Sequence, residues 1–332
     1  MKKLLIWYLL FFFGVLFGGG TDAVQATMEP AAAQPVAAVI ANNIQSDDFN
    51  SCMLASQWTY SDPVGDSTLT INGTQLLISV PAGSIHDLWT NANSAPRLMQ
   101  PANNTDFEIE VKFETTVNSK FQLQGIIVQQ DSDNFIRFDF YHDGSSANIF
   151  YAKFVNGIVT EFFGDNSIGS GSPMYMRIKR EGDVFTQDYK LGNGSWQNHL
   201  SKPYIGLNVT EVGVFAGNVN SNPVNAPAFT AAVDYFFNTA SPISPEDSDT
   251  NVLSLNAIGQ GSIIPSPNKS EYNCGEQVTL TATHDPGWLF SGWNQPYQGN
   301  ANPFVLTISG DHSVTANFVE ATNFLFFPFV EN

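Results

Sequence analysis

The chain has 332 residues, a formal net charge of −18, 43% hydrophobic residues and 27 Phe, but only 13% charged residues. This acidic balance argues against nucleic acid and anionic membranes as partners, because both would be repelled. The apolar content excludes intrinsic disorder, and the low charge is typical of an extracellular β protein that offers neutral hydrogen-bonding groups.

Residues 1–26 predict a secretory signal peptide. Lys2 and Lys3 precede the apolar run Leu4–Phe17, and Val24-Gln25-Ala26 has small residues at the offsets expected of a cleavage site. The run reaches only about 21 Å of a roughly 30 Å hydrocarbon core, so cleavage is favoured over the alternative of a retained membrane anchor. We therefore expect a secreted or extracellular protein, with cell-surface association left open and no membrane span after cleavage.

Residues 46–240 predict an antiparallel β-sandwich, which follows an Ala/Pro tether at residues 27–45. Strand patterns recur at close spacing between Asn-Gly, Asp-Gly and Gly-Ser pairs, without sustained helical periodicity. In Phe107–Glu114, apolar and charged residues alternate, so a shift of one register would bury four charges. The fold class is therefore all-β, with two packed sheets. The predicted strands are Thr68–Ile71, Gln75–Val80, Phe107–Phe113, Phe121–Gln130, Phe135–Tyr141, Ala147–Phe154, Met174–Arg180, Val184–Lys190, Thr210–Phe215 and Phe229–Phe237.

The stretch Pro173–His199 indicates which kind of sandwich this is. Two alternating runs are broken by Glu181-Gly182-Asp183, and a third run opens after Gly192-Asn193-Gly194, which predicts a meander with one buried face. The stretch resembles the pattern "LRleRdGdtftayyS.DGksW" of concanavalin A-like jelly rolls, of the uncharacterised bacterial type related to β-xylosidase C-terminal domains. Further matches in order are Asp47-Asp48-Phe49, His86–Trp89, Ala95–Leu98, Asp106–Glu108 and Phe229–Phe236. The resemblance implies a jelly-roll fold and says less about activity.

A Pro- and acid-rich linker at 241–250 precedes a small domain predicted at 251–320. Gly259–Ile263, Val278–Ala282, Gly287–Trp293 and His312–Phe318 resemble the internalin-type bacterial B-repeat. That resemblance implies a β-grasp-like module that spaces or presents other domains, with Trp288, Phe290 and Trp293 in its core. The hydrophobic tail at 321–332 fits either a final strand or a sorting or docking segment.

The two cysteines, Cys52 and Cys274, fall in different predicted domains. An exported protein could join them in a disulfide. Because of their placement, we favour two buried free thiols.

No catalytic residue is predicted. Glu108 and Glu110 lie two apart on one strand face, roughly 6.6 Å between Cα atoms, so geometry alone allows a pair of glycosidase carboxylates. Lys112 on the same face would lower the pKa of nearby carboxyls, which is the wrong direction for a general acid. Nucleophile elbows, paired metal-binding His and phosphate loops do not occur in the sequence.

A carbohydrate site is the favoured hypothesis, because sugars need an aromatic platform and planar polar groups. Strand alternation places Arg137, Asp139 and Tyr141 on one face of Phe135–Tyr141, and Gln129 could join them. In the alternative interpretation, Trp89 lies in the core and Arg137 pairs with Asp139. The predicted carbohydrate-binding residues are Trp89, His86, Asp87, Arg97, Arg137 and Tyr141.

The cofactor prediction is either none or one structural calcium ion. Asp48 and Asp234 lie at the two ends of the sandwich sequence, where calcium could join the first and last strands. Asp and Asn also favour turns without metal. Taken together, the sequence predicts an exported, non-catalytic protein that binds a polysaccharide or cell-surface glycan. The alternatives are a glycoside hydrolase that cleaves O-glycosyl bonds and a purely structural adhesin.

Overall fold

A computed structural model of the chain describes residues 43–90, 92–248 and 250–321. The predicted signal peptide, the tether up to residue 42 and the tail from residue 322 lie outside the described residues. Apart from the short 3-10 helix Pro223–Asn225, the described elements are strands, which confirms the all-β class. Within these ranges, the structure contains no helix of the length and apolarity that a membrane crossing requires.

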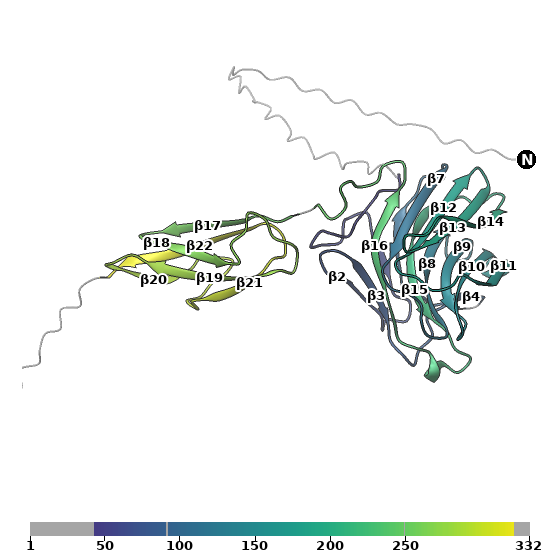
Figure 1. Cartoon of the computed structure of the whole chain (residues 1–332), viewed down its shortest axis with the longest axis horizontal. Helices are drawn as coiled ribbons and strands as arrows, with labels where there is room; N and C mark the ends of the chain where they lie inside the picture. Colours follow the sequence, from purple (N-terminus) through teal and green to yellow (C-terminus); the bar gives the residue numbers. More distant parts are fainter. Residues whose placement is uncertain (1–42, 91, 249, 322–332) are drawn as a thin grey trace, which may run out of the picture. The chain divides into compact units, whose positions relative to one another are not determined.

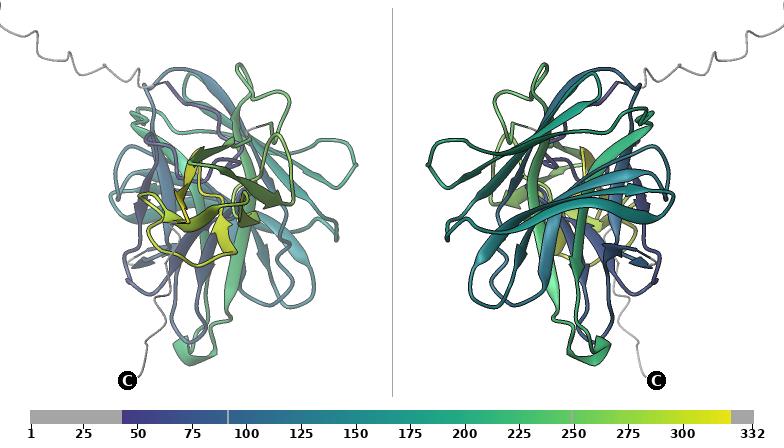
Figure 2. Two further views of the ribbon diagram at one scale, coloured as in Figure 1. Left: turned by 90° about the vertical axis from the view of Figure 1, so that its left-hand side faces the viewer. Right: turned by 90° about the vertical axis from the view of Figure 1, so that its right-hand side faces the viewer.

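Two antiparallel sheets of seven strands each form the sandwich. Figure 1 and Figure 2 show the strands arranged in two layers. Sheet 1 has the order β1-β6-β15-β8-β9-β10-β11, and sheet 2 has the order β14-β13-β12-β7-β16-β3-β2. Sheet 1 comprises β1 Thr59–Ser61, β6 Arg97–Pro101, β15 Glu211–Asn218, β8 Gln122–Gln129, β9 Phe135–His142, β10 Ala147–Val155 and β11 Ile158–Ser167. Sheet 2 comprises β14 Gln197–Pro203, β13 Val184–Leu191, β12 Met174–Glu181, β7 Phe107–Phe113, β16 Phe229–Asn238, β3 Leu76–Val80 and β2 Thr68–Ile71. The sequence-based list of strands lacked β1, β6, β11 and β14, although the meander predicted for Pro173–His199 included a third run after Gly194, next to β14.

The main core lies between the two sheets and follows the predicted alternation. On β9, the side chains of Ile136, Phe138 and Phe140 belong to this core, while Arg137 and Asp139 lie on the opposite, outer face. The side chains of β7 alternate in the same way, since Ile109, Val111 and Phe113 are buried in the core cluster. The period-two pattern therefore assigned both faces of these strands correctly.

A second apolar cluster lies on the outer face of sheet 1, under the segment 81–96 that contains β4 Leu88–Trp89 and β5 Ala92–Asn93. Leu88 is fully buried there among sheet residues such as Phe215. The segment approaches the sheet closely at Gly217, where a Cβ atom would lie 2.3 Å from the carbonyl oxygen of His86. Two backbone hydrogen bonds of 3.0 Å between His86 and Asn218 hold it in place. Gly217 thus permits the close approach.

Residues 251–320 form two three-stranded sheets with a hydrophobic cluster of their own. Trp293 is buried in this cluster, and Trp288 and Phe290 pack against it, as the sequence predicted. Strands β17 and β22 pair in parallel, whereas the other pairs are antiparallel. The strands are β17 Leu253–Ile258, β18 Gly261–Ser266, β19 Gln277–His284, β20 Trp288–Trp293, β21 Phe304–Thr307 and β22 His312–Glu320. The boundaries of the predicted domains stay predictions.

A disulfide joins Cys52 to Cys274 across 222 residues of sequence, with a Cα–Cα distance of 5.2 Å. The prediction of two free thiols is wrong. It rested on the assignment of the cysteines to separate domains, and sequence separation gives no measure of distance in the folded chain. The crosslink closes a long loop, which restricts the unfolded chain.

Replacing both cysteines with Ala is expected to lower the free energy of unfolding by about 2–4 kcal/mol, because the unfolded chain regains loop entropy. Denaturant unfolding of oxidised and reduced protein provides the comparison, and peptide mapping without reductant should recover Cys52 linked to Cys274. Two titratable thiols in the unfolded, unreduced protein would contradict the crosslink.

Candidate functional site

The centre of the candidate site is Arg137, which lies on the outer face of β9 and is only 4% exposed. Its Nε and Nη2 atoms donate to the two carboxylate oxygens of Asp139 at 2.8 and 2.9 Å. Its Nη1 donates to Asp87 Oδ1 at 2.8 Å and to the carbonyl oxygen of Leu88 at 2.7 Å. The guanidinium therefore connects β9 to the segment 81–96, and its position is set by four hydrogen bonds.

The two carboxylates also keep this buried group charged. Burial lowers the pKa of Arg137, but the opposite charges of Asp139 and Asp87 raise it by more, so the net direction is upward. A charged guanidinium that is held by four hydrogen bonds has little freedom to transfer a proton. The arrangement favours orientation of a ligand over chemistry on it.

An open cavity of about 200 Å³ lies beside this network. Asp87 and Asp139 contribute its polar side, and Trp89 and Tyr141 contribute aromatic rings. The remaining lining residues are Phe121, Leu123, Arg137, Phe150 and Val219. We call it the outer-face cavity.

The rings next to this cavity form an aromatic cluster of Trp89, Tyr141, Phe150 and Phe162. The Trp89 ring lies 6.0 Å from Phe150 and 5.7 Å from Phe162, and Phe150 stacks with Phe162 at 6.3 Å. The Tyr141 ring meets Phe150 edge to face at 5.8 Å. Phe162 is 58% exposed, so the cluster extends from the buried Arg137 to solvent. It offers apolar ring surface next to charged hydrogen-bonding groups.

Four of the six predicted binding residues meet at the outer-face cavity, namely Asp87, Trp89, Arg137 and Tyr141. The other two do not line it. His86 is fully buried, with Nε2 2.6 Å from Asp66 Oδ1 and Nδ1 3.1 Å from Asn218 Oδ1, so it helps to hold the covering segment. Arg97 is half-buried on β6, where its Nη1 donates to Asn93.

The structure also bears on the alternative interpretation, in which Arg137 pairs with Asp139 and Trp89 lies in the core. Arg137 does pair with Asp139, but the pair borders the cavity instead of replacing it. Trp89 packs against other rings and still lines the cavity. Gln129 donates to Glu211 at 2.5 Å and does not line the cavity.

Sequence reasoning missed Phe150 and Phe162. Strand β10 is apolar on both faces, because one face meets the main core and the other meets the outer cluster. Alternation therefore gave no signal for Phe150. On β11, the bulges in the pairing with β10 interrupt the pattern around Phe162.

The carboxylates of Glu108 and Glu110 project from sheet 2 and are separate from the outer-face cavity. Glu110 accepts hydrogen bonds from Arg177 Nη2 and the Tyr235 hydroxyl, both at 2.6 Å. Glu108 lies 3.6 Å from Arg177 Nε. These pairings support a structural role for both glutamates.

The predicted calcium ligands, Asp48 and Asp234, have protein partners. Asp234 Oδ2 accepts from Lys112 Nζ at 2.6 Å, and Asp48 Oδ2 accepts from the backbone N–H of Asp247 at 3.3 Å. Over the described ranges, no group of three or more His, Cys, Asp or Glu is arranged to hold a metal ion. Lys112 already supplies a positive charge to Asp234, so the residues fit calcium poorly, and the calcium site stays a prediction.

Glu246, which belongs to the linker, lies close to Asp234 and Lys112. Its Oε1 atom is 3.9 Å from Lys112 Nζ. Burial and, after it, a hydrogen bond with Asp234 raise the pKa of the Glu246 carboxyl from its ordinary value of 4.5 to about 7. The linker thus contacts the sandwich through a carboxyl, Glu246, whose charge changes near neutral pH.

The folded chain should hold a proton on Glu246 up to about pH 7, whereas the unfolded chain releases it near pH 4.5. The stability from this group is therefore present below pH 4.5 and is lost as the pH rises to about 7. Urea unfolding at about pH 5 and about pH 8 should show a larger loss of stability for wild type than for Glu246→Gln. Glu181→Gln, at an exposed carboxyl, is the matched control. Equal losses in wild type and Glu246→Gln would refute the shifted pKa.

Two family models match the chain, one over the sandwich and one over the small domain. Residues 46–237 match the family model described as "Beta xylosidase C-terminal Concanavalin A-like domain", and residues 251–322 match the "Divergent InlB B-repeat domain". No curated protein matches the chain.

Several solved structures are similar to more than half of this chain. A GH43B protein of a Bacteroides ovatus xyloglucan PUL is 15% identical, with 57% of this chain and 38% of that chain covered and a TM-score of 0.46. A xylan beta-1,4-xylosidase from Bacillus halodurans C-125 is 16% identical, with coverages of 58% and 38% and a TM-score of 0.46. A legume lectin-like domain from Entamoeba histolytica is 12% identical, with coverages of 55% and 88% and a TM-score of 0.41. This chain thus spans little more than a third of the length of the two bacterial proteins.

The match over residues 46–237 covers more than half of the sequence. The chain belongs to the family of β-xylosidase C-terminal concanavalin A-like domains, here followed by a divergent B-repeat.

Proposed function

We propose that this protein is an exported, non-catalytic carbohydrate-binding protein and that the outer-face cavity is its glycan site. The observation that carries the proposal is the aromatic cluster beside the buried Arg137 network. A sugar ring has an apolar C–H face and a belt of hydroxyls, which match these two kinds of surface.

The division of roles follows from exposure. Trp89, which lines the cavity, and the exposed Phe162, whose ring lies 5.7 Å from that of Trp89, would stack on the sugar face. Asp87 and Asp139 would accept hydrogen bonds from sugar hydroxyls through lone pairs that Arg137 does not use. Since Arg137 holds both carboxylates in place, the site is ordered before a ligand arrives.

The absence of catalysis is part of the proposal. A glycosidase needs one carboxyl that carries a proton and a second that is free to act as base or nucleophile. Both acids at the cavity are hydrogen-bonded to the same guanidinium, so neither is free to act as a base or nucleophile, although burial raises the pKa of the Asp139 carboxyl. The arrangement therefore supports binding over hydrolysis.

Export and the role of the repeat belong to the same proposal. The predicted signal segment directs the chain to an oxidising compartment, and the Cys52–Cys274 disulfide is stable in such a compartment. The B-repeat would space or present the sandwich at a polysaccharide or a cell-surface glycan. Family membership is compatible with this role.

Phe162→Ala is expected to weaken binding of the full chain to its glycan at least tenfold, about 1.4 kcal/mol, because an exposed stacking surface is lost. Calorimetry against a panel of neutral xylan-, glucan- and mannan-derived oligosaccharides measures this, and Trp89→Ala should weaken binding further. Phe163→Ala is the matched control, since Phe163 pairs with Tyr151 on the core side of the same strand.

Three results would count against the proposal. If no glycan binds, a structural adhesin becomes the better explanation. If Phe162→Ala and Phe163→Ala bind equally well while both stay folded, the glycan site lies elsewhere. Release of reducing sugar from a polysaccharide would show that the protein is an enzyme.

A further inference from the structure

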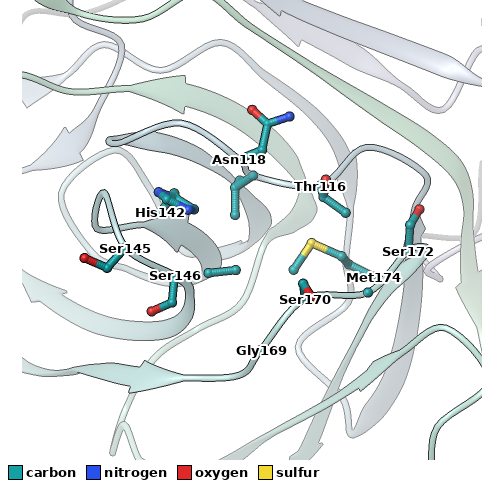
Figure 3. A pocket seen from close by; sticks show the side chains of 12 residues that line it. Thr116, Asn118, His142, Ser145, Ser146, Gly169, Ser170, Ser172 and Met174 are labelled. Atoms are coloured by element: carbon teal, nitrogen blue, oxygen red, sulfur yellow. The ribbon is translucent and has the colours of Figure 1, made fainter.

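A second and larger cavity, of about 560 Å³, opens at one end of the sandwich. Three connections surround it: the segment after β7, the turn between β9 and β10, and the segment between β11 and β12. Figure 3 shows the labelled side chains around the opening, with the Met174 sulfur near the middle. We call it the sandwich-end cavity.

The floor of this cavity is the end of the main hydrophobic core. Val117, Ala147 and Met174 line it, and all three are buried members of the core cluster. Next to the floor, the fully buried Gln124 donates to the Met174 sulfur at 3.7 Å, while its Oε1 has no hydrogen-bond partner among the described residues. The floor is thus apolar with one unsatisfied acceptor close by.

The rim is polar and uncharged. Thr116, Asn118, His142, Ser145 and Ser170 lie on it, and the cavity has no Asp, Glu, Lys or Arg in its lining. Within the described part of the chain, the side chains of Thr116, Asn118, Ser145 and Ser170 make no hydrogen bond. The absence of Asp, Glu, Lys and Arg from this lining contrasts with the net charge of −18 on the whole chain. Donors and acceptors are therefore available to a ligand at several points of one opening.

We propose that the sandwich-end cavity is a second ligand site, one that takes a neutral polyhydroxylated ring such as an uncharged sugar unit. The C–H face of the ring would rest on Met174 and Val117, and its hydroxyls would meet the free polar groups of the rim. A charged ligand would find no counterion there and would lose its hydration at the edge of the core. The site is separate from the outer-face cavity and does not depend on it.

The test uses the full chain with ¹³C-labelled Met methyl groups. Met174 lies in the floor, whereas Met176 is buried in the core two residues away and serves as an internal reference. Spectra of Met174→Leu assign the signal. Titration with xylohexaose, cellohexaose or laminarihexaose should shift the Met174 methyl in a saturable way, both in wild type and in Phe162→Ala. Hexagalacturonate, which is charged, should not shift it.

A blocking variant makes the test specific. Ser170 is exposed on the rim, so Ser170→Trp should fill the opening and weaken the affinity reported by Met174 at least tenfold. Ser195→Trp, at an exposed serine outside this cavity, should leave that affinity unchanged.

The outcomes separate this proposal from the proposed function. If the Met174 methyl signal does not shift while the protein binds glycan in a way that depends on Phe162, the second site is refuted and the outer-face site is supported. A shift of Met174 without binding that depends on Phe162 supports the second site and contradicts the first. No response at either site contradicts both, and an equal shift with hexagalacturonate contradicts the preference for neutral ligands.

Discussion

The hydrogen bonds of one buried guanidinium, that of Arg137, organise the outer face of sheet 1, where the candidate site lies. Arg137 joins a sheet strand to the segment 81–96 through Asp87 and the Leu88 carbonyl, and it is itself held by Asp139. Loss of one partner in such a network leaves an uncompensated buried charge, which typically costs about 3–5 kcal/mol. The position of Trp89, and with it the aromatic cluster, follows from this anchoring, because Trp89 comes directly after Leu88.

The outer faces of the two sheets have different chemistry. On sheet 1, a covering segment buries a second apolar cluster and leaves a cavity with rings and carboxylates. On sheet 2, Glu110 is engaged by Arg177 and Tyr235, and Lys112 is engaged by Asp234. Groups that satisfy one another have little left for a ligand, although a cavity of about 210 Å³ adjoins Glu110 and Arg177 on sheet 2. The face of sheet 1 differs because it combines a cavity with the aromatic cluster.

The fold could be predicted from sequence because its main signal is local. Alternation in β7 and β9 identified the buried face of each strand, and family-like patterns identified the jelly roll. The site was harder, since Asp87 and Arg137 meet only through the path of the covering segment, which depends on the close approach at Gly217. Phe162 was missed because bulges disturb the pattern of its strand, and the disulfide was missed because its two ends were assigned to separate domains.

The disulfide also changes what a cut in the backbone would do. Cys52 and Cys274 lie on either side of the segment Ser241–Thr250 in the sequence, so any cleavage within that segment falls inside the crosslinked loop. A protease that severs this Pro- and acid-rich stretch would produce a nicked protein whose two fragments travel together until a reductant separates them. In an oxidising compartment such as the proposed extracellular location, where reductants are scarce, the repeat would thus stay attached to the sandwich even after its peptide connection had been lost.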